Sequence, residues 1–184
     1  MLTKKGVILF LIIILPLFLL LAIIKFERFL PLPIVVRRTI HTFFPEKDFY
    51  KPVFIDDEFL LTQEGFSKEY LLDIKYYDFY RLGLVSTKGD IPAKYEFKGL
   101  IKLEFFCNNE LIFSHNISSA SRKCFAGKDL GRLERIDLFE FPFPIAGKYK
   151  KDVKMKLTVL KQDLELLPYM DSIQISVEPY GLFY

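Results

Sequence analysis

The feature that most limits what this chain can fold into is a run of 19 residues, Gly6 to Ile24, without a charged or amide side chain. About 20 helical residues, rising about 1.5 Å each, cross the roughly 30 Å hydrocarbon core of a bilayer. Lys4 and Lys5 precede the run as in a signal sequence, but no A-x-A cleavage site follows it. We therefore expect residues 1–5 to be a cytoplasmic tail and residues 6–26 a retained transmembrane signal anchor.

The orientation of this span follows less directly from the charges. Positive residues favour the cytoplasmic side, and a literal count would leave the C-terminal part inside. Long folded domains, however, cross the membrane largely regardless of charge, and the start of the chain is typical of a signal sequence. We expect a single-pass protein of the inner (cytoplasmic) membrane, with its C-terminal domain in the periplasm or otherwise extracytoplasmic. The competing charges beyond the span are Lys25, Arg28, Arg37 and Arg38 against Glu27.

A juxtamembrane connector, residues 27–47, is interrupted by Pro31, Pro33 and Pro45. Between the prolines, residues 34–44 have apolar side chains at helical spacing, so a short helix on the lipid headgroups is one interpretation. An irregular linker is the other. Both stay open at this point.

The hydrophobic period changes in residues 48–184. In Lys151–Leu160 and Ser172–Glu178, apolar and polar residues alternate, which is typical of strands with one buried face. Similar alternation marks residues 70–76 and 101–107, and shorter candidates are residues 53–55 and the proline-punctuated stretch Ile136–Phe143, expected at an edge or bulge. These patterns predict an all-β fold, an antiparallel β-sandwich of about seven strands.

A hairpin is predicted around Asn108, because asparagine tolerates the left-handed conformation that short hairpin loops need. If residues 108–110 form the loop, Phe105 faces Phe113 and Ile101 faces Ile117 across the pair of strands.

Gly147, Tyr149 and the alternating run after them resemble the G-x-Y element and penultimate strand of immunoglobulin-like sandwiches. The chain departs from true immunoglobulin domains in having no Trp. Its layout, a signal anchor before a small aromatic-rich sandwich, is similar to that of uncharacterised bacterial membrane-anchored periplasmic proteins. Some of those are immunity proteins against toxins. The resemblance implies an immunoglobulin-like sandwich and a protein partner.

Charge argues against nucleic acid as a partner. Residues 1–47 hold seven Lys and Arg against two Glu, so the remaining residues carry 19 basic and 21 acidic side chains, a net charge of −2. A domain with this balance lacks the clustered basic face that nucleic-acid binding requires.

The two cysteines suit an oxidising compartment. A bridge between Cys107 and Cys124 would close a short loop and add about 3 kcal/mol in the chain-entropy model. The alternative is two separate thiols, with Cys107 buried in its strand. His115 lacks the paired spacings of a zinc site, and Asp56, Asp57 and Glu58 lack the pattern of a calcium loop, so we expect no metal.

The motifs of nucleophilic and phosphate chemistry are missing from the sequence. We therefore expect neither an enzyme nor a cofactor, although a pair of carboxylates brought together by folding is compatible with any acidic sequence. The densest charge run of the domain could instead meet an acidic protein partner, or be a solvated loop. Its residues are Arg122, Lys123, Lys128, Arg132 and Arg135.

These observations favour a membrane-anchored extracytoplasmic protein-binding module, with an immunity or inhibitor role against an envelope-acting toxin as the leading hypothesis. The alternative is a structural or accessory subunit of a membrane or secretion complex, in which the span itself packs against other helices.

Overall fold

The computed structural model describes residue 36 and residues 51–76, 78–126, 129–145 and 152–180. The predicted tail and membrane span lie outside this range, and only Val36 of the predicted connector lies inside it. Among the described residues, no helix is long and apolar enough to cross a bilayer. What the structure describes is therefore almost entirely the predicted C-terminal domain.

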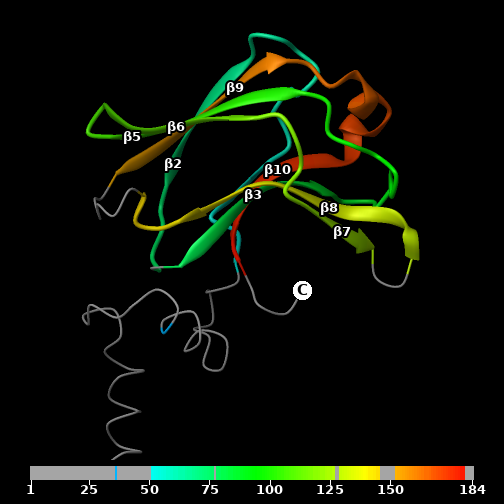
Figure 1. Cartoon of the computed structure of the whole chain (residues 1–184), viewed down its shortest axis with the longest axis horizontal. Helices are drawn as coiled ribbons and strands as arrows, with labels where there is room; N and C mark the ends of the chain where they lie inside the picture. Colours follow the sequence, from blue (N-terminus) through cyan, green and yellow to red (C-terminus); the bar gives the residue numbers. More distant parts are fainter. Residues whose placement is uncertain (1–35, 37–50, 77, 127–128, 146–151, 181–184) are drawn as a thin grey trace, which may run out of the picture. The chain divides into compact units, whose positions relative to one another are not determined.

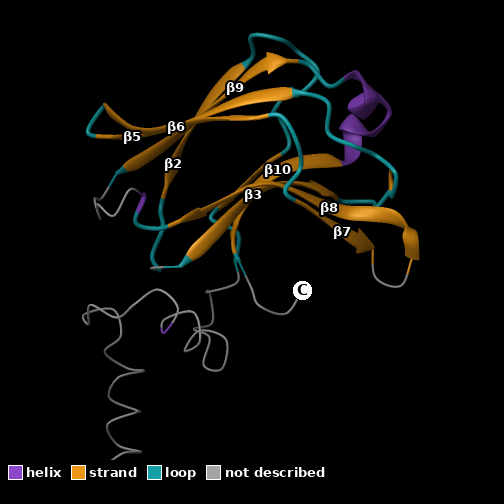
Figure 2. Ribbon diagram, viewed as in Figure 1, coloured by secondary structure: helices purple, strands orange, loops and turns teal. Residues whose placement is uncertain are grey.

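Two antiparallel sheets form this domain, so the all-β sandwich predicted from the sequence is confirmed (Figures 1 and 2). The larger sheet contains β1 (Phe54–Asp56), β3 (Phe79–Ser86), β4 (Ile91–Pro92), β7 (Arg122–Ala126), β8 (Asp129–Pro142) and β10 (Ile173–Pro179). The smaller sheet contains β2 (Ser67–Leu72), β5 (Leu100–Cys107), β6 (Glu110–Ile117) and β9 (Val153–Lys161). A 3₁₀-helical segment, η4 (Leu164–Ser172), joins β9 to β10.

The strands pair in a nested order. β1 pairs with β10, β2 with β9, β3 with β8, and β5 with β6. This nesting is the jelly-roll arrangement, in which a ribbon of paired strands wraps into two facing sheets. In each sheet a strand from the end of the chain separates two early ones, since β10 lies between β1 and β3, and β9 between β2 and β5.

The strand order corrects the immunoglobulin-like part of the prediction. Immunoglobulin sheets place successive strands such as A and B side by side, in the orders ABED and CFG. Here β10 takes the place beside β1 that β2 would hold in that order. Gly147 and Tyr149, which carried the resemblance, lie outside the described residues.

Several predicted strands are confirmed together with their register. β9 and β10 coincide closely with the two alternating segments recognised in the sequence. The β5–β6 hairpin turns through Asn108 and Asn109, whose φ angles are 52° and 62°. It pairs Phe105 with Phe113 and Ile101 with Ile117, as predicted.

Aromatic side chains tie the two sheets together. Phe105 of β5 is fully buried, and its ring centroid lies 4.9 Å from that of Phe141 on β8. Tyr80 of β3 packs beside Phe141 and donates a 3.1 Å hydrogen bond to the carbonyl of Tyr76. Such aromatic pairs contribute about 0.5–1.5 kcal/mol beyond the area that they bury. The aromatic residues of the sequence thus form much of the core.

The two ends of the sandwich differ in what they present. At the near end, where β1 begins and β10 finishes, the N–H of Val53 donates to the carbonyl of Val177. The β5–β6 turn and the β2–β3 connection also lie there. At the far end, β9 leads into η4 and residues 87–99 connect β3, β4 and β5 (Figure 1). The candidate site lies at the far end.

Candidate functional site

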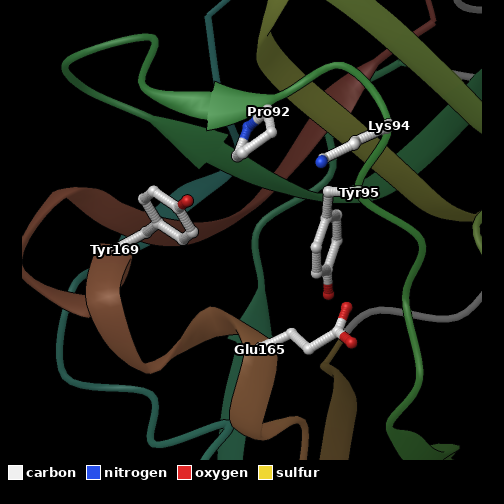
Figure 3. A pocket seen from close by; sticks show the side chains of 5 residues that line it. All are labelled: Pro92, Lys94, Tyr95, Glu165 and Tyr169. Carbon is white, nitrogen blue, oxygen red and sulfur yellow. The ribbon is translucent and has the colours of Figure 1, made fainter.

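A pocket of about 240 Å³ opens at the far end (Figure 3). Two segments form its lining: the stretch that includes β4 and continues after it supplies Pro92, Lys94 and Tyr95, and η4 supplies Glu165 and Tyr169. Figure 3 shows the two tyrosine rings on opposite sides of the pocket, with the Glu165 carboxylate facing the Tyr95 hydroxyl. Two aromatic walls with one cation and one anion suit recognition of another molecule.

A buried carboxylate holds this pocket in shape. Asp163 precedes η4 and caps it, because its Oδ1 accepts from the N–H of Glu165 at 3.1 Å. Its Oδ2 accepts from the Tyr95 hydroxyl at 2.6 Å and from the N–H of Lys98 at 2.8 Å. Burial, and then the hydrogen bond to Asp163, raise the pKa of Tyr95 above its ordinary value. The phenol therefore stays protonated and keeps donating.

The rim of the pocket carries an exposed ion pair. Lys98 Nζ lies 2.5 Å from Glu165 Oε1, and both side chains are more than half exposed. Lys98 donates a hydrogen bond to the Glu165 carboxylate, and this bond raises the pKa of Lys98. Because exposed pairs contribute little to stability, Glu165 is available to exchange Lys98 for a group on a ligand. Lys94, also exposed, supplies a second positive charge at the rim.

The other end of η4 is fixed by a second carboxylate, Asp90. It accepts from the hydroxyl of Ser86 at 2.7 Å and from that of Ser172 at 2.9 Å. Burial by itself would raise the pKa of Asp90, but these hydrogen bonds bring it below its ordinary value. Both ends of η4 are therefore bonded to the segment that follows β3.

Exposed leucines surround the same end. In η4, Leu164 and Leu167 are 55% and 54% exposed. Leu160, near the end of β9, and Leu60, in the loop before β2, are also exposed. That loop lies against the start of η4, because the N–H of Asp163 donates to the carbonyl of Leu61. We call the pocket and the leucines Leu60, Leu160, Leu164 and Leu167 the far-end surface.

No model of a known protein family matches the chain, and no curated protein matches it. The far-end surface is therefore interpreted from its own chemistry. This surface combines exposed apolar side chains with a few polar groups that hydrogen bonds hold in place.

The predicted partner-binding loop is in fact a β-hairpin. Arg122 and Lys123 belong to β7, and Arg132 and Arg135 belong to β8, while Lys128 lies outside the described residues. β7 and β8 pair antiparallel with register shifts after Cys124 and after Phe125. These irregularities break the alternation on which strand prediction depends. β8 is accordingly longer than the predicted strand and starts at Asp129.

Arg135 is not available to a partner, because it lies in a buried ion cluster and is only 6% exposed. Its Nε donates to Oδ1 of Asp137, and its Nη1 lies 2.6 Å from Oε2 of Glu178. Arg81 of β3 joins the same two carboxylates at 3.6 and 3.4 Å. Breaking a buried pair of this kind destabilises a protein by about 3–5 kcal/mol, so Arg135 is structural. Arg122 and Arg132 remain exposed.

The structure does not join Cys107 and Cys124 in the predicted disulfide. Cys107 is fully buried in β5 of the smaller sheet. Cys124 lies in β7 of the larger sheet, opposite Arg135. Cys124 therefore lies on the same face of the larger sheet as Arg135, which is the outer face. Cys107 points into the core from the smaller sheet, so the two thiols do not meet. Burial, and then the nearby Asp137, raise the pKa of Cys124.

The residues weighed as metal ligands have other roles. Asp56 accepts from the Tyr70 hydroxyl at 2.6 Å and from Lys68 Nζ at 3.0 Å. The ring of His115 lies 4.8 Å from that of Phe139. Within the described ranges, no three His, Cys, Asp or Glu side chains come together as a metal site.

Sequence patterns did not indicate the pocket residues. One signal was present, because Asp163 followed two residues later by Glu165 is a helix start with a cap and an acidic first turn. Tyr95 and Tyr169 carry no pattern, since they are 74 positions apart and meet only through the fold.

Proposed function

We propose that this chain is a membrane-anchored, extracytoplasmic protein-binding module whose far-end surface contacts the partner. The observation that carries the proposal is the pairing of a two-tyrosine pocket with exposed leucines at one end of the sandwich. Tyrosines are among the residues that most often contribute the binding energy at the centre of a protein interface.

Capture without chemistry suits an immunity or inhibitor role against an envelope-acting toxin. A preorganised surface binds more tightly because little ordering is needed on binding, and η4 is bonded at both ends before any partner arrives. Stoichiometric neutralisation depends on such affinity. It needs no catalytic group.

A photo-crosslinking amino acid tests the contact surface in cells that carry the full-length chain. Placed at Leu167, in the far-end surface, it should give an adduct with one protein partner. Leu71, which is 64% exposed at the near end, is the matched control and should give none. Adducts at Leu71 but not at Leu167 would contradict the assignment of the surface.

The immunity role has its own test. If a toxin gene lies beside the gene for this chain, cells producing the chain should survive that toxin, and Leu167→Asp should abolish survival while Leu71→Asp preserves it. If cells with either leucine variant survive, and only the exchange of residues 6–26 for an unrelated span abolishes survival, the chain acts through its anchor. That result would instead indicate an accessory subunit.

A further inference from the structure

One side of the sandwich leaves strand edges open in both sheets. β6 is the last strand of the smaller sheet, and no described strand pairs with its outer edge. In the larger sheet, the pairing of β7 with β8 ends at Asp137. Beyond that residue, Phe139–Pro142 pair with β3 on one side, and no described strand pairs with them on the other. Ser114, His115 and Asn116 of β6 are exposed.

Aromatic rings between these two edges are incompletely covered. Phe113 and His115 project inward from β6, because they lie opposite the buried Phe105 and Leu103. Both rings contact Phe139 of β8, with centroid separations of 5.8 Å and 4.8 Å. Phe113 and Phe139 are half-buried and His115 is exposed. An added strand on β6 would shield this stack from water.

The other edges carry devices that discourage pairing, and the regular part of β6 does not. Natural edge strands are protected by charged side chains, proline, bulges or short length. β7 begins with Arg122 and Lys123, β2 contains Lys68 and Glu69, and β1 has three residues. β6 has a bulge at Ile112, where its register with β5 shifts. The five residues after the bulge, Phe-Ser-His-Asn-Ile, include neither a proline nor a lysine, arginine or carboxylate.

We propose that β6 is the contact surface between two copies of this chain, which pair edge to edge and antiparallel about a two-fold axis at His115. With the axis at His115, all five residues after the bulge, 113–117, pair with the same five residues of the second copy. This axis sets Phe113 opposite Ile117 of the second copy and Ser114 opposite Asn116, each twice by symmetry. Pairs of an aromatic with a β-branched residue stabilise antiparallel sheets, and a serine hydroxyl can hydrogen-bond to an asparagine amide.

A second copy fits this edge better than an unrelated strand, because the five residues complement themselves. A two-fold contact requires each residue to match its symmetry mate. In the proposed register the apolar Phe113 and Ile117 face each other, and the polar Ser114 and Asn116 face each other. The far-end surface is formed by other segments and stays free in the pair.

The membrane anchor is compatible with this pairing. A two-fold axis at His115 turns the near ends of the two copies in opposite directions. The predicted connector of 21 residues reaches roughly 70 Å when extended, against about 26 Å for an eight-residue strand. Both predicted spans can therefore enter one bilayer.

The test uses the full-length chain in detergent, with molar mass measured by light scattering or sedimentation over a range of concentrations. The wild type should be a dimer that dissociates on dilution. His115→Lys sets two ammonium groups face to face and should weaken the dimer roughly tenfold or more. His115→Phe should preserve it. Ser119→Lys adds the same charge at an exposed position just beyond β6 and should have no effect.

Cross-linking locates the axis independently. His115→Cys, in a Cys124→Ser background, brings two thiols directly opposite each other and should give a disulfide-linked dimer under mild oxidation. Ser119→Cys in the same background is the control and should stay monomeric on the gel. A wild type that is monomeric throughout, a dimer that survives His115→Lys, or equal cross-linking of both cysteine variants would overturn the proposal. None of these results bears on partner capture at Leu167.

Discussion

The guanidinium of Arg135 lies against the backbone of Gly83, with Nη2 only 2.8 Å from the place where a Cβ of residue 83 would stand. Gly83 pairs with Asp137, the carboxylate to which Arg135 donates. A side chain at position 83 would therefore displace the guanidinium from the ion cluster. Glycine in the middle of β3 is what allows the buried cluster to close.

Gly83→Ala should lower the free energy of unfolding by about 1–3 kcal/mol, because the new methyl group overlaps Arg135 and the carbonyl of Ile136. Denaturant unfolding followed by tyrosine fluorescence measures the change. In an Arg135→Ala background the cost of the alanine should shrink, since the displaced side chain is gone. An unchanged cost would contradict the role of the arginine.

Tyr95→Phe removes the hydroxyl that donates to Asp163, and leaves a buried carboxylate with one fewer hydrogen bond. We expect a loss of about 1–3 kcal/mol in the free energy of unfolding. Tyr169→Phe, at the opposite wall of the pocket, should change stability by less than about 0.5 kcal/mol. Equal effects of the two variants would show that the hydrogen bond to Asp163 does not hold the pocket.

Asp56 makes the domain sensitive to acid. Burial opposes its charge, but hydrogen bonds from Tyr70 and then Lys68 bring its pKa below the ordinary value. A carboxyl group with a lowered folded pKa contributes stability above its unfolded pKa of about 4 and loses it as the pH falls through the folded value. The free energy of unfolding should therefore fall between about pH 5 and pH 2.

Asp56→Asn isolates this contribution. The variant should be less stable than the wild type at pH 7, and the difference should shrink towards zero as the pH approaches 2. Unfolding curves at a series of pH values measure how the free energy of unfolding of the variant and of the wild type changes with pH. A difference between variant and wild type that stays constant with pH would exclude Asp56 as the acid-sensitive group.

Thiol titration checks the correction of the predicted disulfide. Unfolded, unreduced chain should show two reactive thiols, because the structure does not join the two cysteines in a disulfide. In the folded chain Cys107 should be protected by its burial, and Cys124 should react slowly because burial raises its pKa. No thiol in the unfolded state would restore the bridge.

Regular alternation made part of the fold predictable from the sequence. β5 and β9 have one buried face and one more exposed face, so periodicity predicts their positions, and the asparagines at the turn predict the register of the β5–β6 hairpin. The sequence of β3 does not alternate clearly, because both of its faces are buried and Phe79, Gly83 and Val85 share the outer face with Arg81. The role of Arg81 is visible only in the ion cluster that it forms with Asp137.

Strand order and the pocket could not be predicted, because both depend on contacts between residues far apart in the chain. Nothing local shows that β10 inserts between β1 and β3. Tyr95 and Asp163 are likewise separated by 68 positions and joined by a single hydrogen bond. The segment from Arg122 to Arg135 was predicted to be a loop, but most of it forms the paired strands β7 and β8. The register shifts between these strands interrupt the alternation by which a hairpin is recognised.

The nested pairing also governs when this domain can acquire its structure. Phe54 pairs with Val177, which lies 123 positions later in the chain. β2 likewise pairs only with β9, which comes much later in the sequence. Contacts between residues so far apart in the sequence make folding slow, because the entropy of closing the intervening loop is lost before the stabilising hydrogen bonds form. Most of the polypeptide must therefore emerge from the ribosome before the sheets can assemble. An unassembled, extended chain is also the form that a protein-conducting channel can thread across a membrane.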